Sequence, residues 1–207
     1  MTLRWDKKNN LLHRGGKVFN PSRLEWSAAP QTTNLSGSEV SPLEALQHLA
    51  KEKSLRRVPV GVIGTRTATK KQLEVARKLG AAMADYGMQL ICGGKGGVME
   101  AACEGHAAHG GLPVGILPDG EWDGANPFCA IPIATGLGVA RNAVIARASV
   151  ALIAVGGGLG TLSEMAMGMQ FKRLVLRLDG APEVEGAASL GTVEEALDRV
   201  ARCLLSL

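Results

Sequence analysis

The chain contains 207 residues, of which 46% are hydrophobic and 20% charged, proportions typical of a globular protein in water. Only 3% are aromatic, which argues against the base-stacking platforms that bind single-stranded nucleic acid. The net charge of +4 arises in residues 1–57, which carry 10 Lys/Arg and 5 Asp/Glu, whereas residues 58–207 carry 13 and 14. We interpret these scattered basic residues as a solvated face in preference to a surface for nucleic acid or a partner.

The N-terminus and the cysteines predict a cytoplasmic protein with no membrane partner. The first ten residues, MTLRWDKKNN, lack the apolar core of a secretory signal, and no apolar run is long enough to span a membrane. The cysteines show neither CxxC spacing nor a disulfide pattern; they are Cys92, Cys103, Cys129 and Cys203. Thiols in this arrangement are typical of a reducing compartment.

Residues 1–56 predict an N-terminal extension. Leu3–Asp6 and Lys17–Phe19 are expected to pair as short strands around a turn-rich middle, and residues 27–40 have the composition of a linker. The sequence SPLE at 41–44 is a capping box with proline at the first helical position, so a helix should begin there. Because this extension alone has little to bury, we expect it to pack on the main domain or on a second subunit.

From Arg57 onward, strands alternate with helices. Apolar runs predict strands at Val58–Ile63, Met88–Cys92, Leu112–Leu117, Ile131–Thr135, Val150–Val155 and Lys172–Leu178. Helical patterns follow at residues 69–87, 98–109, 139–148, 161–169 and 192–205. This alternation predicts a single α/β domain over residues 57–207, with a doubly wound, mostly parallel sheet and helices on both of its faces.

Glycine-rich loops follow several of these strands, at Gly64-Thr65, Gly93–Gly97 and Gly156–Thr161. In doubly wound sheets, ligands bind beyond the carboxyl ends of the strands. The last loop joins a buried strand to the start of a helix, where backbone N–H groups and the helix dipole attract an anion. Glycine also allows a phosphate to approach the backbone closely. We therefore predict a phosphate-bearing small molecule at Gly156–Thr161.

Two common nucleotide motifs do not fit. The nearest approach to GxGxxG is GLGVAR at 136–141, in which Arg141 stands where the third glycine should be. No acidic residue follows at the expected distance, so NAD binding is not predicted. The P-loop also fails, because Lys95 is followed by glycine instead of serine or threonine.

Three charged residues have more than one interpretation. Arg141 lies in the first turn of its helix, where a cation opposes the dipole, so it either pairs with a bound anion or covers apolar surface with its stem. Glu164 either forms a capping box with Thr161 or faces the sugar of a nucleotide, where a carboxylate stabilises an oxocarbenium-like transition state. Lys95 either touches a phosphate or is solvated.

No metal site is predicted. His106 and His109 are three residues apart on a helix, but neither a third histidine nor a suitably placed cysteine accompanies them, so structural or exposed roles are favoured. The alternating Met165, Met167 and Met169 fit core packing.

Four motifs occur in the order that characterises a known superfamily. They are CGGKGGVME at 92–100, GILP at 115–118, GLGVARN at 136–142 and GGGLGTLSE at 156–164. Together they resemble the superfamily that joins the Lonely Guy phosphoribohydrolases, the molybdenum cofactor carrier proteins and DNA-processing protein A. The resemblance covers roughly residues 57–178 and implies a Rossmann-like fold. It is strongest to the molybdenum cofactor carrier-like branch, through the GVME motif and the run TGLGVARN at 135–142.

This resemblance implies a binding or carrier protein for a phosphate-bearing pterin, such as molybdenum cofactor, or for a nucleotide-like ligand such as a nucleoside monophosphate. It implies no other cofactor, and a homo-oligomer, either dimer or tetramer. The ligand-binding residues that it implies are Gly64, Thr65, Gly93, Gly94, Gly96, Gly97, Met99, Arg141, Asn142, Gly156, Gly157, Gly158, Gly160 and Thr161.

Two alternatives follow from the same resemblance, so turnover stays open. The Lonely Guy motif PGGxGTxxE is present except for its proline, and that family's catalytic arginine and glutamate correspond to Arg141 and Glu164. These residues would allow a nucleoside 5′-monophosphate phosphoribohydrolase, which hydrolyses the N-glycosidic bond. The third hypothesis is a DNA-binding protein related to DNA-processing protein A, against which the charge of residues 58–207 counts.

Overall fold

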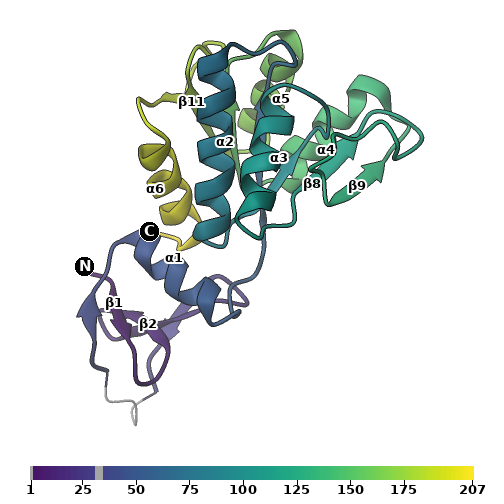
Figure 1. The fold of residues 1–207 in the computed structure, drawn as a ribbon. Helices are drawn as coiled ribbons and strands as arrows, with labels where there is room; N and C mark the ends of the chain where they lie inside the picture. The colour runs from purple at the N-terminus through teal and green to yellow at the C-terminus, as the bar shows by residue number, and fades with distance from the viewer. Residues whose placement is uncertain (1, 31–34) are drawn as a thin grey trace.

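The computed structural model describes residues 2–30 and 35–207. In this part of the chain, a five-stranded antiparallel sheet is followed by a seven-stranded parallel sheet with helices on both faces (Figure 1). The described residues include no helix long and apolar enough to cross a membrane.

In the N-terminal sheet, an unexpected strand lies between the two strands that the sequence predicted to pair. The strand order is β4-β3-β2-β1-β5, with bounds β1 Arg4–Asp6, β2 Leu11–Arg14, β3 Lys17–Asn20, β4 Glu25–Ala28 and β5 Ser38–Glu39. The predicted direct pairing of Leu3–Asp6 with Lys17–Phe19 is therefore wrong, because β2 lies between them. Asn10, Gly15 and Gly16 all have positive φ, so the chain reverses on both sides of β2. The predicted linker at 27–40 falls partly on residues 31–34, outside the described part.

The N-terminal sheet packs against the C-terminal end of the chain. The indole Nε1 of Trp26 donates to Leu205 O at 2.6 Å, and Arg14 donates to Ser206 O. Helix α1 (Pro42–Lys51) begins at the predicted capping box of Ser41 and Glu44 and lies between the sheet and the rest of the molecule (Figure 1). The division of the chain at residue 57 stays a prediction.

The parallel sheet is doubly wound, as predicted. Its order is β12-β11-β10-β6-β7-β8-β9. The bounds are β6 Pro59–Gly64, β7 Gln89–Cys92, β8 Val114–Leu117, β9 Ile131–Ala134, β10 Ala151–Val155, β11 Leu174–Leu178 and β12 Ala188–Ser189. From β6 the chain winds outward to β9, and from β10 it winds the other way to β12. The strand order therefore reverses between β6 and β10, the place where such sheets bind ligands.

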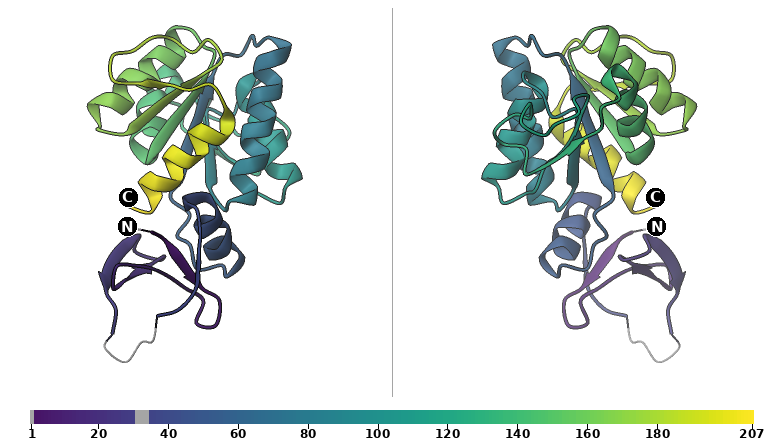
Figure 2. Two further views of the ribbon diagram at one scale, coloured as in Figure 1. Left: turned by 90° about the vertical axis from the view of Figure 1, so that its left-hand side faces the viewer. Right: turned by 90° about the vertical axis from the view of Figure 1, so that its right-hand side faces the viewer.

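Two layers of helices cover this sheet (Figure 2). The bounds are α2 Lys70–Asp85, α3 Val98–Ala108, α4 Asn142–Ala148, α5 Leu159–Gln170 and α6 Val193–Leu204. Helices α2, α3 and α6 share one hydrophobic cluster, whereas α4 and α5 belong to the other. Gly80 of α2 faces Ala102 O of α3 so closely that an added Cβ would overlap it, and Gly105 faces Arg77 O in the same way.

Helices α4 and α5 begin differently from the prediction. The segment expected as one helix at 139–148 consists of a 3-10 turn at Gly138–Arg141 followed by α4. Helix α5 begins at Leu159 with Gly158 as its N-cap, so Thr161 lies within its first turn and does not cap it. The capping-box interpretation of Thr161 and Glu164 is therefore wrong.

One edge of the parallel sheet is formed by β9. Ile131 and Ile133 are exposed there, each at 44%, and Pro132 lies between them. The amide of Ile131 donates to Pro113 O on the side of β8. The loop before β9 is held by Lys95, whose Nζ donates to Gly124 O at 2.8 Å and forms an ion pair with Asp119.

Candidate functional site

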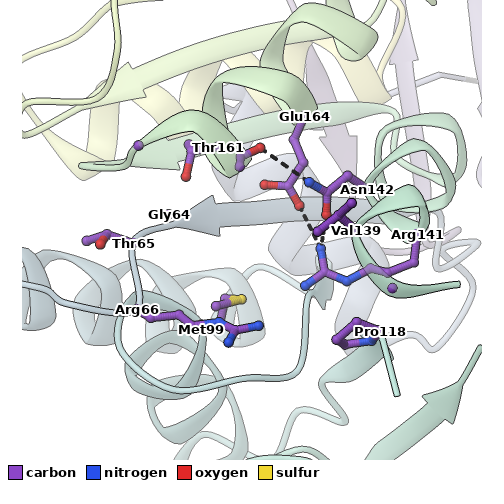
Figure 3. A pocket seen from close by; sticks show the side chains of 13 residues that line it. Gly64, Thr65, Arg66, Met99, Pro118, Val139, Arg141, Asn142, Thr161 and Glu164 are labelled. Carbon is purple, nitrogen blue, oxygen red and sulfur yellow. Dashed lines mark hydrogen bonds and ion pairs between the residues drawn. The ribbon is translucent and has the colours of Figure 1, made fainter. Parts of the chain in front are cut away.

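A cavity of about 270 Å³ opens at the carboxyl ends of β6 and β10, where the strand order reverses (Figure 3). This volume is close to the lower limit for small-molecule sites. Its walls come from five segments that are distant in sequence. The lining residues are Gly64, Thr65, Arg66, Met99, Pro118, Gly138, Val139, Arg141, Asn142, Gly158, Gly160, Thr161 and Glu164.

Arg141 and Glu164 form a buried ion pair in the cavity wall, and each residue is only 6% exposed. Arg141 Nη1 lies 3.2 Å from Glu164 Oε1 and also donates to the Asn142 side chain, while Nη2 donates to Gly93 O at 3.4 Å. Arg141 Nε is buried and has no acceptor among the described residues. Arg141 is therefore not a surface residue, and its guanidinium is only partly satisfied by the protein (Figure 3).

Burial dominates the ionisation of this pair. It raises the pKa of Glu164 to about 7, against the opposing effect of the Arg141 charge. Burial also lowers the pKa of Arg141, and the Glu164 carboxylate opposes that change. Glu164 can thus gain or lose a proton near neutral pH, whereas arginine keeps its charge. A carboxyl group of this kind is able to act in proton transfer.

The glycines of the loop before α5 differ in what they do. Gly156 and Gly157 have φ of +54° and +136°, values that glycine tolerates and other residues rarely adopt. Gly158 and Gly160 do not have positive φ, and a Cβ added at either would meet no atom within 4 Å. The fold therefore does not require glycine at these two positions, which leave open space in the cavity beside the first turn of α5.

Nine predicted site residues line the cavity, and six do not. The nine are Gly64, Thr65, Met99, Arg141, Asn142, Gly158, Gly160, Thr161 and Glu164, and the six are Gly93, Gly94, Gly96, Gly97, Gly156 and Gly157. Two of the six directly support the lining: a Cβ at Gly93 would overlap the Arg141 guanidinium, and one at Gly97 would overlap Thr65 O and Arg66 O. Direct ligand contact by the six glycines stays a prediction.

Sequence reasoning missed Arg66, Pro118, Gly138 and Val139, which all line the cavity. A single arginine in a polar loop forms no pattern. One sequence feature could have identified Arg66 as a cavity residue: it directly follows Gly64-Thr65, at the end of a predicted central strand.

The other polar residues that the sequence analysis singled out have structural partners. Lys95 does not line the cavity and is neither fully solvated nor free, because it holds the loop before β9. His106 is buried, with Nε2 3.0 Å from Met88 O, and His109 lies 2.8 Å from Asp85. Cys92 and Cys103 are free thiols packed with their sulfur atoms 3.5 Å apart.

The strand order and the cavity at its reversal point define a Rossmann-like α/β protein. Residues 57–202 match the sequence model of the SLOG cluster4 family, and the chain belongs to this family. This confirms the superfamily that the four motifs indicated. Residues 1–56 lie outside the match.

Known proteins resemble the same part of the chain. An uncharacterized protein from Archaeoglobus fulgidus is 41% identical over 144 residues, which cover 70% of this chain and 95% of that protein. The structure of the molybdenum cofactor binding protein from Rippkaea orientalis is similar with a TM-score of 0.67 and 32% identity, covering 71% of this chain and 97% of its own. The structure of the molybdenum cofactor carrier protein from Chlamydomonas reinhardtii is similar with a TM-score of 0.65 and 35% identity, covering 72% of this chain and 99% of its own.

Proposed function

We propose that this protein binds and carries a phosphate-bearing small molecule, a pterin such as molybdenum cofactor or a similar nucleotide-like ligand. The observation that carries the proposal is the open space at Gly158 and Gly160, two glycines that the fold itself does not require. The similarity to two molybdenum cofactor proteins supports the choice of ligand class.

The chemistry of the cavity fits a phosphate next to α5. The amides in the first turn of a helix have no acceptor within that helix, and no side chain caps α5. They therefore stay available to phosphate oxygens, and the helix dipole adds to the attraction. Above the Glu164 pKa of about 7, the Glu164 carboxylate offsets the Arg141 charge, so the pair can orient a ligand while adding little net charge.

Gly158→Asp tests this proposal sharply, because it should have opposite effects on folding and on binding. Aspartate is a favourable N-cap, so the variant should unfold at the same temperature as the wild type or slightly above it. Its carboxylate would occupy the phosphate space and repel the ligand, so affinity for AMP should fall by at least about tenfold. Calorimetric titration measures the affinity, and native mass spectrometry of freshly purified protein would identify a co-purifying ligand.

Gly191→Asp is the matched control, since Gly191 precedes α6 and lies outside the cavity. It should bind AMP as the wild type does. Unchanged AMP affinity in Gly158→Asp would contradict a phosphate site at this helix, and so would failure of the wild type to bind AMP or any co-purifying phosphorylated compound.

A second candidate function is the phosphoribohydrolase, favoured by one observation. Glu164 lies in the cavity wall with a pKa raised to about 7, which suits a group that assists cleavage of an N-glycosidic bond. Incubation of AMP and related nucleoside monophosphates with the protein at stoichiometric concentration decides the matter: absence of any free base removes this candidate. Should a free base appear, Glu164→Gln must abolish its release while AMP binding persists.

Assembly and location are further proposals. An apolar surface formed by Val144, Ala148 and Phe171 supports a homo-oligomer, dimer or tetramer, whose order light scattering would show. The free thiols support a reducing, cytoplasmic location, which imaging of the tagged protein in its cell would test.

A further inference from the structure

Arg66 lines the cavity but takes no part in the phosphate site at α5. It follows the loop at the end of β6, and its side chain enters the cavity from the side opposite to Thr161 and Glu164 (Figure 3). The residue is exposed, and no carboxylate among the described residues forms an ion pair with it. A guanidinium that lines a cavity without a partner is available to a ligand.

The charges around the cavity do not balance. The lining contains two guanidinium groups and one carboxylate, and the carboxylate of Glu164 is already paired with Arg141. Nearby Asp119 is paired with Lys95. Arg66 therefore has no ion-paired carboxylate. Its charge acts only from a distance on Asp119, whose pKa is lowered mainly by the Lys95 hydrogen bond and to a smaller extent by Arg66. Arg66 also lies near enough to Arg141 to disfavour its charged form, helping to lower the pKa of Arg141.

A second observation also points to an anionic ligand. Arg141 Nε is a buried donor without an acceptor in a side chain that is more than nine-tenths buried. A buried donor left unpaired costs free energy, so such groups usually have a partner in the occupied state. An anionic group bound near both arginines would offset the charge of this incompletely paired guanidinium and reduce the repulsion between the two cations.

We propose that Arg66 binds a second anionic group of the ligand, so that the ligand class carries two oxyanions, a phosphate at α5 and another group near Arg66. This inference rests on the proposed function, which places the first phosphate at α5. Arginine suits the second position because its planar guanidinium can pair with an oxyanion through two parallel hydrogen bonds. Because Arg66 is exposed, solvent weakens its interaction with an anion. We therefore expect this contact to increase ligand affinity by only about tenfold.

Titration with adenosine nucleotides of one and two phosphoryl groups tests the proposal. The probes are AMP, ADP and adenosine 3′,5′-bisphosphate. ADP, the bisphosphate or both should bind the wild type about tenfold more tightly than AMP does. Arg66→Gln should remove this gain by weakening ADP and the bisphosphate more than it weakens AMP, and Arg66→Lys should retain part of the gain because lysine offers the charge without the fork.

Arg199→Gln is the matched control, an exposed arginine of α6 outside the cavity. It should keep the preference for two phosphoryl groups, and loss of the preference there would mean that general surface charge produces it. The proposal is overturned if the wild type binds all three probes equally, or if Arg66→Gln weakens AMP and the other probes by the same factor. Failure of the wild type to bind AMP or any co-purifying phosphorylated compound is a separate result, which overturns the proposed function and this inference together.

Discussion

At the scale of single residues, Glu164 experiences two opposing effects. Burial favours its neutral form, whereas the Arg141 guanidinium 3.2 Å away favours the carboxylate. Burial is the larger effect, and the pKa of about 7 lies above the ordinary value of 4.5. The folded protein therefore binds a proton at Glu164 over a pH range in which the unfolded chain has already released it.

This difference predicts how stability depends on pH. Between pH 4.5 and about 7, the unfolded chain is stabilised relative to the folded protein as pH rises, so the wild type loses stability in this window and levels off above it. Glu164→Gln lacks the titration, although it leaves Arg141 unpaired at every pH. Relative to this variant, the free energy of unfolding of the wild type should fall by on the order of 3 kcal/mol between pH 4.5 and about 7.

Urea unfolding at pH 5, 6, 7 and 8 measures this effect. Glu185→Gln, at an exposed glutamate that forms no ion pair with the residues the structure describes, serves as the control and should follow the wild-type profile. Parallel profiles for the wild type and Glu164→Gln would show that Glu164 ionises in the folded protein as it does in the unfolded chain.

The site shows which residues sequence can identify. Gly158, Gly160 and Arg141 belong to motifs, so their positions could be predicted before the fold was known. Arg66 could not, because its place in the cavity depends on the path of the loop after β6. The role of Glu164 was ambiguous for a related reason: whether Thr161 caps the helix is decided by the backbone at Gly156 and Gly157.

At the scale of elements, the contact between α2 and α3 depends on two glycines. Gly80 and Gly105 let the helix backbones approach closely enough that either Cβ would overlap a carbonyl of the other helix. Helix α3 begins at Val98, and the Val98 amide donates to Thr65 O in the loop that lines the cavity. The helix contact therefore helps to position one wall of the site.

Gly80→Ala should destabilise the protein, although replacing glycine by alanine usually stabilises a helix. In an open helix this change stabilises by up to about 1 kcal/mol, but here the helices would have to separate. We expect a loss of about 2 kcal/mol, as overpacked cores show. Gly120→Ala, where a Cβ meets no atom within 4 Å, should change little. Chemical denaturation measures both, and a stabilised Gly80→Ala would mean that the helices are not in this close contact.

Strands and helices of residues 57–207 were predictable because apolar runs alternate with helical periods. The exceptions were short or local in origin. β2 has four residues between two turns and was absorbed into a turn-rich segment. The start of α4 is preceded by a 3-10 turn of four residues, which is too short to show a spacing of its own in the sequence.

At the scale of the whole molecule, the two sheets share one hydrophobic core. Leu12 and Phe19 of the N-terminal sheet belong to the same buried cluster as Leu197 and Leu204 of α6. The hydrogen bond from Trp26 to Leu205 O joins the same two regions. Residues outside the family match are thus part of the folded unit that also contains the cavity.

We therefore expect a single unfolding transition. Trp5 and Trp26 lie in the N-terminal sheet, so tryptophan fluorescence reports that sheet, whereas far-UV circular dichroism reports mainly the helices. Their urea midpoints should coincide, as in cooperative unfolding. Trp122 is 65% exposed in the loop before β9, and Trp122→Phe removes its contribution. A fluorescence midpoint at lower urea would instead establish residues 1–56 as a separately unfolding part.

The proline in β9 limits how copies of this chain can associate. Because the Ile131 amide points toward β8, alternation along the strand directs position 132 to the free edge of the sheet. Proline has no N–H to offer there, so an incoming strand would find only the Ala134 amide along β9. The exposed isoleucines on either side therefore lie on an edge that resists continuation into a fibril-like sheet.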